Sequence, residues 1–317
     1  MRLSDYAPRP SHIKWLLDSD PAIRRHVMTD LIDAPPHAIA AERSRVATEG
    51  WGAKLLARQS PSGKWGGSKE DRGLLITFYS LVLLKDLGLD PASKAARRMT
   101  ARVGRLRFKW HNNRAFFDGE TEPCINGRIL GAGAYFKEPN DTLANQLLGE
   151  QLEDGGWNCE AIEETPKRPK SRRSSFHTTI CVLEGLLEYE RARRQPAAVT
   201  KARQRAENYL LERRMFRSLR TGEVNDERWL RFSFPTFWHY DVLRGLDYFR
   251  EAGSKPDSRV REAIEIVIER RHQNGRWPIN LLHPEYIPLK METAVGSASR
   301  WNTLRALRVL RWYSNSM

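Results

Sequence analysis

The sequence has few cysteines and no long apolar segment. Its three cysteines, Cys124, Cys159 and Cys181, are odd in number and form no Cys-x-x-Cys pair. Neither a disulfide framework nor a zinc ribbon is therefore predicted. No apolar run reaches the roughly 18 residues that a membrane-spanning helix needs, and the first residues lack the apolar stretch of a signal peptide. We expect a cytoplasmic protein.

Sustained alternation of apolar and polar residues is also missing, so little β-structure is expected. Helix signals are frequent instead. Asp20 is a good N-cap and Pro21 suits the first helical position. Residues 74–84 contain no charged side chain, which indicates a helix buried on all sides, whereas residues 91–105 are amphipathic and basic. The sequence therefore predicts an all-α protein in which outer helices cover inner ones.

This alternation of inner and outer helices repeats along the chain. Inner helices are predicted to begin near Leu74, Cys124, Phe176, Trp238 and Arg300. Outer helices are predicted to begin near Pro91, Asp141, Ala197 and Asp257. A period of roughly 50 to 60 residues indicates stacked units, each too small to bury its own apolar face.

A second repeat lies in the turns between these units. Residues 59–65 and 151–157 fit the pattern Gln-x-x-x-Gly-x-Trp, and residues 271–277 fit it with Arg in place of Gln. Glycine permits a left-handed residue where the outer helix ends. Gln or Arg can bond the loop backbone or stack on the indole, and Trp buries a large area. We interpret these turns as structural staples.

The staple turns resemble the QW motifs of squalene and terpene cyclases, which protein prenyltransferase β-subunits share in weaker form. The resemblance covers roughly residues 50–313 and implies an α/α toroid, a ring of inner helices inside a ring of outer helices. Residues 49–317 would form this toroid, and residues 1–48 look like a HEAT-type helical cap. The catalytic Asp-x-Asp-Asp motif of the cyclases and the zinc-binding Asp-x-Cys pair of the prenyltransferases are both missing. The resemblance therefore implies the fold without the chemistry.

In such a toroid, the starts of the inner helices surround one mouth of the central cavity. The polar and aromatic residues there are the candidate substrate-binding residues: Cys124, Asn126, Arg128, Phe176, Trp238, Arg300, Trp301 and Asn302. A few convergent polar groups in an apolar wall are typical of a small-molecule pocket. Each also has a structural interpretation, such as a helix cap for Asn126 or a contact with a neighbouring unit for Arg300.

The candidate catalytic residues are His239, Asp241, His177 and Glu122. Asp241 either orients His239 as a general base or occupies the start of a helix. His177 is a candidate base or a core histidine. An aromatic pocket around Glu122 would raise the pKa of its carboxyl group and make it a general acid.

Metal binding and nucleophilic catalysis are weaker alternatives. Cys124, His177, His239 and Asp241 have donor atoms that suit Zn²⁺, but no spacing supports a site. No cofactor is therefore predicted, and zinc is kept as a minor alternative. Cys124 beside His177 would suit a nucleophile and its base.

Three functions remain open at this stage. The first is a terpene cyclase-like or prenyltransferase-like protein that binds or transforms a largely apolar, isoprenoid- or lipid-like molecule in an aromatic-lined cavity. Arg128, Arg300 and the basic loop 166–173 would then hold an anionic head group. The net charge of +14 instead suits a non-catalytic repeat module for nucleic acid or an acidic protein. The third is a carbohydrate-active toroid with paired carboxylates and exposed tryptophans.

Overall fold

The computed structural model describes residues 7–66, 70–109, 112–161, 171–194, 196–283, 287–292 and 294–314. These residues are mostly helical, as the sequence predicts. A small antiparallel hairpin joins β1 (Arg107–Phe108) to β2 (Arg114–Ala115). Short 3₁₀ helices are η2 (Phe116–Asp118), η3 (Cys159–Ala161), η4 (Glu227–Leu230) and η5 (Ser258–Val260). Within these ranges, no helix has the length and apolar character needed to cross a membrane.

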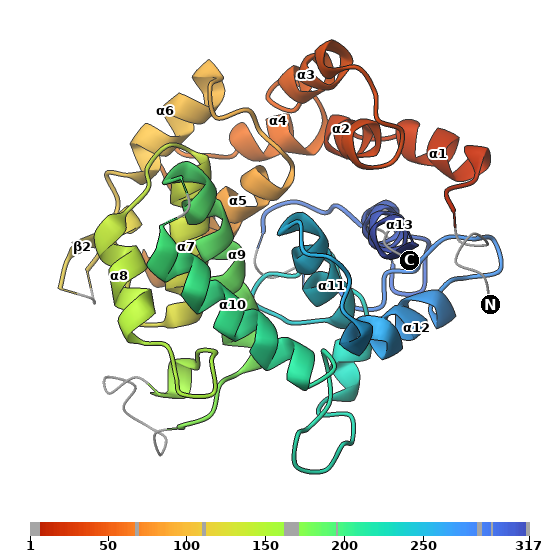
Figure 1. The fold of residues 1–317 in the computed structure, drawn as a ribbon. Helices are drawn as coiled ribbons and strands as arrows, with labels where there is room; N and C mark the ends of the chain where they lie inside the picture. The colour runs from red at the N-terminus through yellow and green to blue at the C-terminus, as the bar shows by residue number, and fades with distance from the viewer. Residues whose placement is uncertain are drawn as a thin grey trace.

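The helices form two concentric layers, so the predicted α/α toroid is confirmed (Figure 1). The inner helices are α5 (Glu70–Asp86), α7 (Pro123–Tyr135), α9 (Phe176–Ala192), α11 (Val242–Glu251) and α13 (Arg300–Ser314). The outer helices are α6 (Lys94–Val103), α8 (Asp141–Gly149), α10 (Ala197–Glu212) and α12 (Arg261–Glu269). The helix predicted near Trp238 begins at Val242, because Asp241 is its N-cap and accepts a hydrogen bond from the Arg244 amide at 2.7 Å. The other helices begin within four residues of their predicted starts.

The staple turns share one set of contacts, which confirms their structural role. The indole N–H of Trp157 donates to the carbonyl of Leu147 in the last turn of α8 (2.7 Å), and its amide donates to the Thr179 hydroxyl of α9 (3.0 Å). Equivalent bonds join Trp65 to Leu55 and Thr77, and Trp277 to Val267 and Thr303. All three indoles are fully buried. The staples of Trp157 and Trp277 therefore tie the end of an outer helix to the next inner helix, and that of Trp65 ties the N-terminal helix α4 (Gly50–Leu56) to α5 in the same way.

The other motif residues also act as the sequence predicts. Gln151 donates to the carbonyl of Gly155 (2.7 Å) and to a carbonyl of α10 (2.8 Å). Gly155 has a φ of +99°, a conformation that glycine adopts readily. In the third turn, Arg271 donates to the Gly275 carbonyl (3.2 Å) and lies over the Trp277 ring, 5.4 Å from its centroid. Arg thus replaces Gln without loss of the turn.

The N-terminal helices close the ring. They are α1 (Pro10–Leu17), α2 (Pro21–Asp30), α3 (Pro36–Arg45) and α4 (Gly50–Leu56), and they run between α13 and α5 (Figure 1). The third staple packs on α1, where His12 Nε2 lies 3.3 Å from the Asn274 carbonyl oxygen. Helix α2 packs against α13. Residues before position 49 therefore take part in the ring itself, while the division into two domains at that point stays a prediction.

Candidate functional site

A cavity of about 450 Å³ lies inside the ring, within the size range of small-molecule sites. Its wall is formed mainly by charged side chains. The basic ones are Arg25, Arg43, Lys85, Arg128, Arg191, Arg244, Arg250, Arg305 and Arg308. The acidic ones are Asp30, Asp86, Glu184, Glu188, Asp247 and Glu251. The apolar and aromatic part of the wall consists of Leu187, Phe234, Trp301, Tyr135 and Tyr248.

The cavity lies toward the C-terminal halves of several inner helices, whereas the sequence placed it at their starts. Lys85 and Asp86 are at the end of α5, Tyr135 ends α7, and Arg191 is near the end of α9. Among the candidate site residues, only Arg128 and Trp301 line it. The expectation of an aromatic-lined cavity at the helix starts is therefore wrong.

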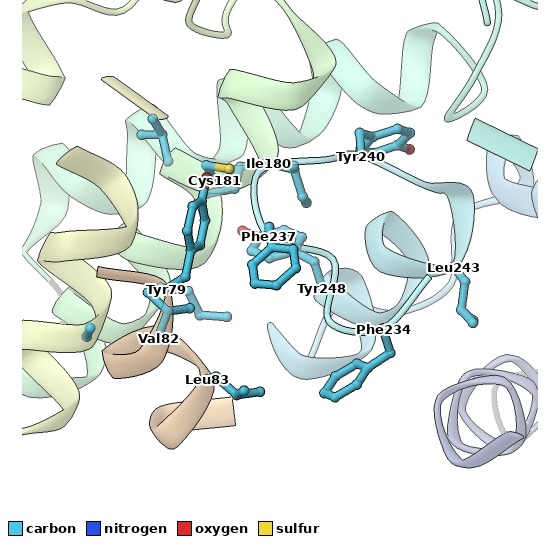
Figure 2. Packing of buried hydrophobic residues seen from close by; sticks show 14 of the residues in the cluster. Tyr79, Val82, Leu83, Ile180, Cys181, Phe234, Phe237, Tyr240, Leu243 and Tyr248 are labelled. Carbon is cyan, nitrogen blue, oxygen red and sulfur yellow. The ribbon is translucent and has the colours of Figure 1, made fainter. Parts of the chain in front are cut away.

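A segment that we call the plug, residues 232–240, explains the difference. Figure 2 shows Phe237 projecting toward Tyr79 of α5, and their ring centroids are 4.8 Å apart. Phe237 is only 2% exposed. Phe234 stacks on Trp301 with centroids 4.2 Å apart. Aromatic side chains of the plug therefore occupy the region in which an apolar ligand was predicted from the sequence.

Two carboxylates organise the charged wall. Glu184 of α9 accepts hydrogen bonds from Arg128 (2.9 Å) and from Arg244 (2.7 Å). Burial alone would raise the pKa of Glu184, but the two guanidinium groups outweigh burial and lower it to about 2. Asp247 of α11 likewise accepts hydrogen bonds from Arg308 and Arg250, with nitrogen–oxygen distances of 2.7 and 2.8 Å.

Arg25 of α2 has no such counter-ion. No carboxylate of the described residues lies within 4 Å of its guanidinium group, which instead bonds the His26 imidazole (2.8 Å). That imidazole is neutral, because burial and the Arg25 charge lower the pKa of His26 to about 4. Burial also lowers the pKa of Arg25. Tyr135 and the more distant Asp30 oppose this shift, and the nearby Arg43 adds to it. The wall thus contains a cation whose charge is not neutralised by an ion pair.

Asp241 caps α11 instead of orienting His239. Its Oδ1 accepts the Arg244 amide bond, its Oδ2 accepts a long bond from the Ser233 amide (3.4 Å), and Arg305 lies 3.6 Å away. Burial raises the pKa of Asp241, and Arg305 opposes this effect. The helix-start interpretation of Asp241 is the one that these contacts support.

The two candidate histidines lie in one aromatic cluster, and His239 belongs to the plug itself. His177 Nδ1 accepts a hydrogen bond from the Tyr240 amide (2.8 Å), and burial together with the Arg244 charge lowers the pKa of His177 to about 4. His239 is stacked on Trp238 (3.9 Å) and on His283 (4.0 Å). Burial, then the neighbouring His283, lowers the pKa of His239 to about 3. Both rings are therefore neutral at pH 7, and neither lines the charged cavity.

Protonation of His177 should be visible in the pH dependence of stability. Its pKa is about 4 when folded and about 6.5 in an unfolded chain. The unfolded state therefore binds more protons in this window, and the stabilisation present above pH 6.5 is lost as the pH falls to 4, by about 3 kcal/mol. In His177→Asn, the amide oxygen still accepts the Tyr240 bond but does not titrate. Urea unfolding between pH 7 and 4 should show a shallower loss for this variant, and equal losses would contradict the assignment.

Several candidate binding residues hold loops together. Asn126 accepts a bond from the Glu120 amide (2.7 Å) and donates to the Glu120 carbonyl (2.9 Å). Asn302 donates to the carbonyls of Pro278 (2.9 Å) and Phe232 (3.3 Å). Both side chains are fully buried. Asn126 and Asn302 occupy equivalent positions in two repeats, and their contacts hold the adjacent loops in place.

Two more candidates make structural contacts elsewhere. Arg300 donates to the Asp18 carbonyl (3.0 Å) and lies over the Trp15 ring (4.8 Å), so it joins α13 to the N-terminal helices. Phe176 is buried against Trp229, with ring centroids 4.5 Å apart. Neither residue lines the charged cavity.

Among the acids near the helix starts, the buried one is not Glu122, which was selected from the sequence. Glu122 is exposed, so it lacks the predicted aromatic pocket. Glu120 is buried nearby, and burial raises the pKa of its carboxyl group to about 7. Burial likewise raises the pKa of Glu292 to about 7, although its carboxylate accepts a bond from Ser299. Glu120 lies three residues before α7 and Glu292 eight residues before α13, and only the fold shows that Glu120 is buried and Glu292 half-buried.

The alternative functions require exposed tryptophans or a basic surface. None of the described tryptophans is exposed, and Trp110 lies outside the described residues. The exposed platforms expected of a carbohydrate-active toroid are therefore not found there. Most of the basic loop 166–173, up to residue 170, lies outside the described residues, and Arg172 and Arg173 are exposed.

The concentric helices and the central cavity define the fold of the chain as an α/α toroid. Among solved structures, the apo type II terpene cyclase MstE from Scytonema matches with a TM-score of 0.50 and 16% identity, over 99% of this chain and 98% of that chain. A variant of that cyclase in complex with geranylgeranyl dihydroxybenzoate matches with a TM-score of 0.47 and 15% identity, over 99% and 98%. A protein from Actinoplanes matches with a TM-score of 0.49 and 16% identity, over 98% and 99%. No protein-family profile and no curated protein matches the sequence. Identity at this level supports the fold alone.

Proposed function

We propose that this protein binds a small molecule through an anionic group, held by Arg25 and Arg43 in the charged cavity. The observation that carries the proposal is the guanidinium group of Arg25, which faces the cavity without a carboxylate partner among the described residues. A poorly solvated charge without a counter-ion costs several kcal/mol. Such a cost is understandable if a ligand supplies the missing negative charge.

Arg43 provides a second donor at the same end of the cavity. It donates to the Tyr135 hydroxyl (2.9 Å) and the Gly88 carbonyl (3.2 Å), which hold the side chain in place. Both guanidinium groups line the cavity, and the charge of Arg43 lowers the pKa of Arg25. An anion between them would relieve this repulsion, and guanidinium groups match carboxylate and phosphate oxygens in geometry.

The wall favours a polar group over a hydrocarbon chain. Its basic residues outnumber its acidic ones by nine to six, and its apolar part is small. We therefore expect the polar, anionic part of the ligand to occupy the cavity. The isoprenoid or lipid character of the remainder is supported by the resemblance in fold and not by the lining residues.

The same wall argues for binding over acid catalysis. Burial alone would raise the pKa of Asp30, Glu184, Asp247 and Glu251, but their polar and cationic neighbours outweigh burial and lower each pKa. The main neighbours are His26 for Asp30, arginines for Glu184 and Asp247, and Lys85 for Glu251. These groups are ionised at neutral pH and serve as counter-ions. A proton donor would need a raised pKa.

Substitution of Arg25 should change two measured properties in opposite directions, the stability of the protein and its affinity for an anion. Arg25→Gln should raise the thermal stability of the ligand-free protein, because the substitution removes an unpaired charge. It should also weaken pyrophosphate binding, measured by calorimetry and by thermal shift, about tenfold or more, since a charge-assisted bond contributes about 1.5–3 kcal/mol.

Arg97→Gln, on the exposed face of α6, is the matched control and should leave pyrophosphate affinity unchanged. Equal affinities of the wild-type and Arg25→Gln proteins would contradict the proposal. A loss of stability in ligand-free Arg25→Gln would also contradict it, because that result would assign Arg25 a structural role.

A further inference from the structure

The cysteines of the chain gather at the side of the ring where the inner helices begin. Cys124 lies in the first turn of α7, and Cys159 begins η3. Cys124 and Cys159 are hydrogen-bonded to each other, and Cys181 of α9 is close enough to influence Cys124 electrostatically. Cys124 Sγ also lies 3.6 Å from Glu122 Oε2. This site is independent of the charged cavity.

We propose that Glu122, Cys124 and Cys159 bind one Zn²⁺ ion. One ligand atom from each residue lies within 4.8 Å of the other two, and this is the one such group of three within the described residues. Two sulfurs and a carboxylate oxygen bound to a tetrahedral zinc ion lie about 3.3–3.8 Å apart. Shifts of about 1 Å in side-chain position would therefore complete the site.

The local structure permits these shifts. Glu122 is the N-cap residue of α7, but its side chain makes no capping hydrogen bond, and it is exposed. Its carboxylate can therefore turn toward the two sulfurs. Cys124 and Cys159 are each half-buried, so neither residue is sealed in the core.

The electrostatics of the group also fit a cation. The hydrogen bond between Cys124 and Cys159, followed by burial, raises the pKa of the Cys124 thiol, and Glu122 adds to the shift. Both sulfurs would bind a divalent ion as thiolates beside the carboxylate, so binding should release protons to solvent.

The donor types select the metal. Thiolates favour Zn²⁺ over Mg²⁺ or Ca²⁺, which prefer oxygen ligands. Three protein ligands leave the fourth tetrahedral position for water or a ligand. The set differs from the one considered from the sequence, because His177 and Asp241 are engaged with backbone amides. Cys124 is the residue that the two sets share.

Cobalt substitution tests the site directly. Reduced, metal-free protein should bind one Co²⁺ per chain, with a thiolate-to-cobalt charge-transfer band and the visible bands of tetrahedral cobalt. Zinc should displace it in competition with a chromophoric chelator. Cys124→Ser and Cys159→Ser should each weaken Zn²⁺ binding by more than the roughly 10–100-fold that loss of a supporting hydrogen-bond partner costs.

Two further variants keep the test decisive. Glu122→Gln changes an exposed side chain, so the fold should persist while zinc affinity drops about tenfold or more. Cys181→Ser removes a thiol outside the group of three and should leave both the cobalt spectrum and the zinc affinity unchanged. Circular dichroism would establish that each variant is folded.

Absence of the charge-transfer band would overturn the proposal, as would equal zinc affinity in the wild-type and Cys159→Ser proteins. A Cys124–Cys159 disulfide that, after reduction, gives a protein unable to take up zinc would also overturn it. That outcome would mean that the two cysteines form a disulfide and do not bind a metal ion.

Discussion

Replacing Asp247 with asparagine is expected to lower the free energy of unfolding by about 3–5 kcal/mol. Asp247 is 7% exposed and accepts hydrogen bonds from Arg308 of α13 and Arg250 of α11. Arg308 in turn reaches Asp30 of α2 at 3.0 Å. The asparagine side chain has nearly the same shape but no charge, so these guanidinium groups would lose most of their compensation. Chemical denaturation at pH 7 measures the loss.

A matched substitution at the surface separates the effect of burial on stability from the effect of losing an ion pair. Asp257→Asn removes the partner of Arg259, at 2.8 Å, but this pair is largely solvated, so the cost should stay below about 1 kcal/mol. The double variant Asp247→Asn/Arg308→Met should recover part of the loss, because it also removes the charge left unpaired. Similar costs at positions 247 and 257 would show that the cavity ion pairs are as well solvated as surface ones.

Replacing Trp157 with alanine is expected to cost about 3–5 kcal/mol, the range for removing a large aromatic core side chain. The indole is fully buried and donates to the Leu147 carbonyl, one of the last carbonyls of α8. Such carbonyls have no partner within their own helix. The substitution therefore creates a cavity and leaves a helix end without its side-chain donor. Thermal and urea unfolding both report the loss.

Trp157→Phe distinguishes the two contributions. Phenylalanine keeps most of the apolar area but cannot donate to Leu147, so we expect a loss of about 1–3 kcal/mol. The same ordering should hold at Trp65 and Trp277, which make the equivalent bonds. An alanine variant that loses less than 1 kcal/mol would mean that the turn forms without its tryptophan.

The staples could be predicted from the sequence because their contacts are local. Gln151 bonds Gly155 four residues away, and Trp157 bonds Leu147 ten residues away. These two partners lie within the motif or just before it, whereas Thr179 and the carbonyl of α10 are more distant in sequence. The need for glycine follows from the backbone conformation of the turn, and the need for tryptophan follows from the area that it buries. Three short turns were therefore enough to predict the toroid.

The position of the cavity could not be predicted in the same way. It depends on the plug, and Phe237 meets Tyr79 across a sequence separation that no local pattern encodes. The mixture of polar and aromatic residues around Trp238 suited a pocket wall as well as a segment that fills one. One signal was present on α13, where Trp301, Arg305 and Arg308 recur at intervals of four and three residues and all line the cavity. A charged stripe on an inner helix indicates a polar centre.

The closure of the ring by α1 and α2 has a consequence for the order in which the molecule folds. His12 meets Asn274 and Arg308 meets Asp30 across more than 260 residues of chain. During synthesis the first helices must wait for α13 to leave the ribosome before they find these partners. Contacts of such high contact order form slowly, since the chain must be ordered over a long loop before they contribute. Until then α2 presents Arg25 and His26 without the opposite wall, and we expect the charged cavity to be the last part of the molecule to be assembled.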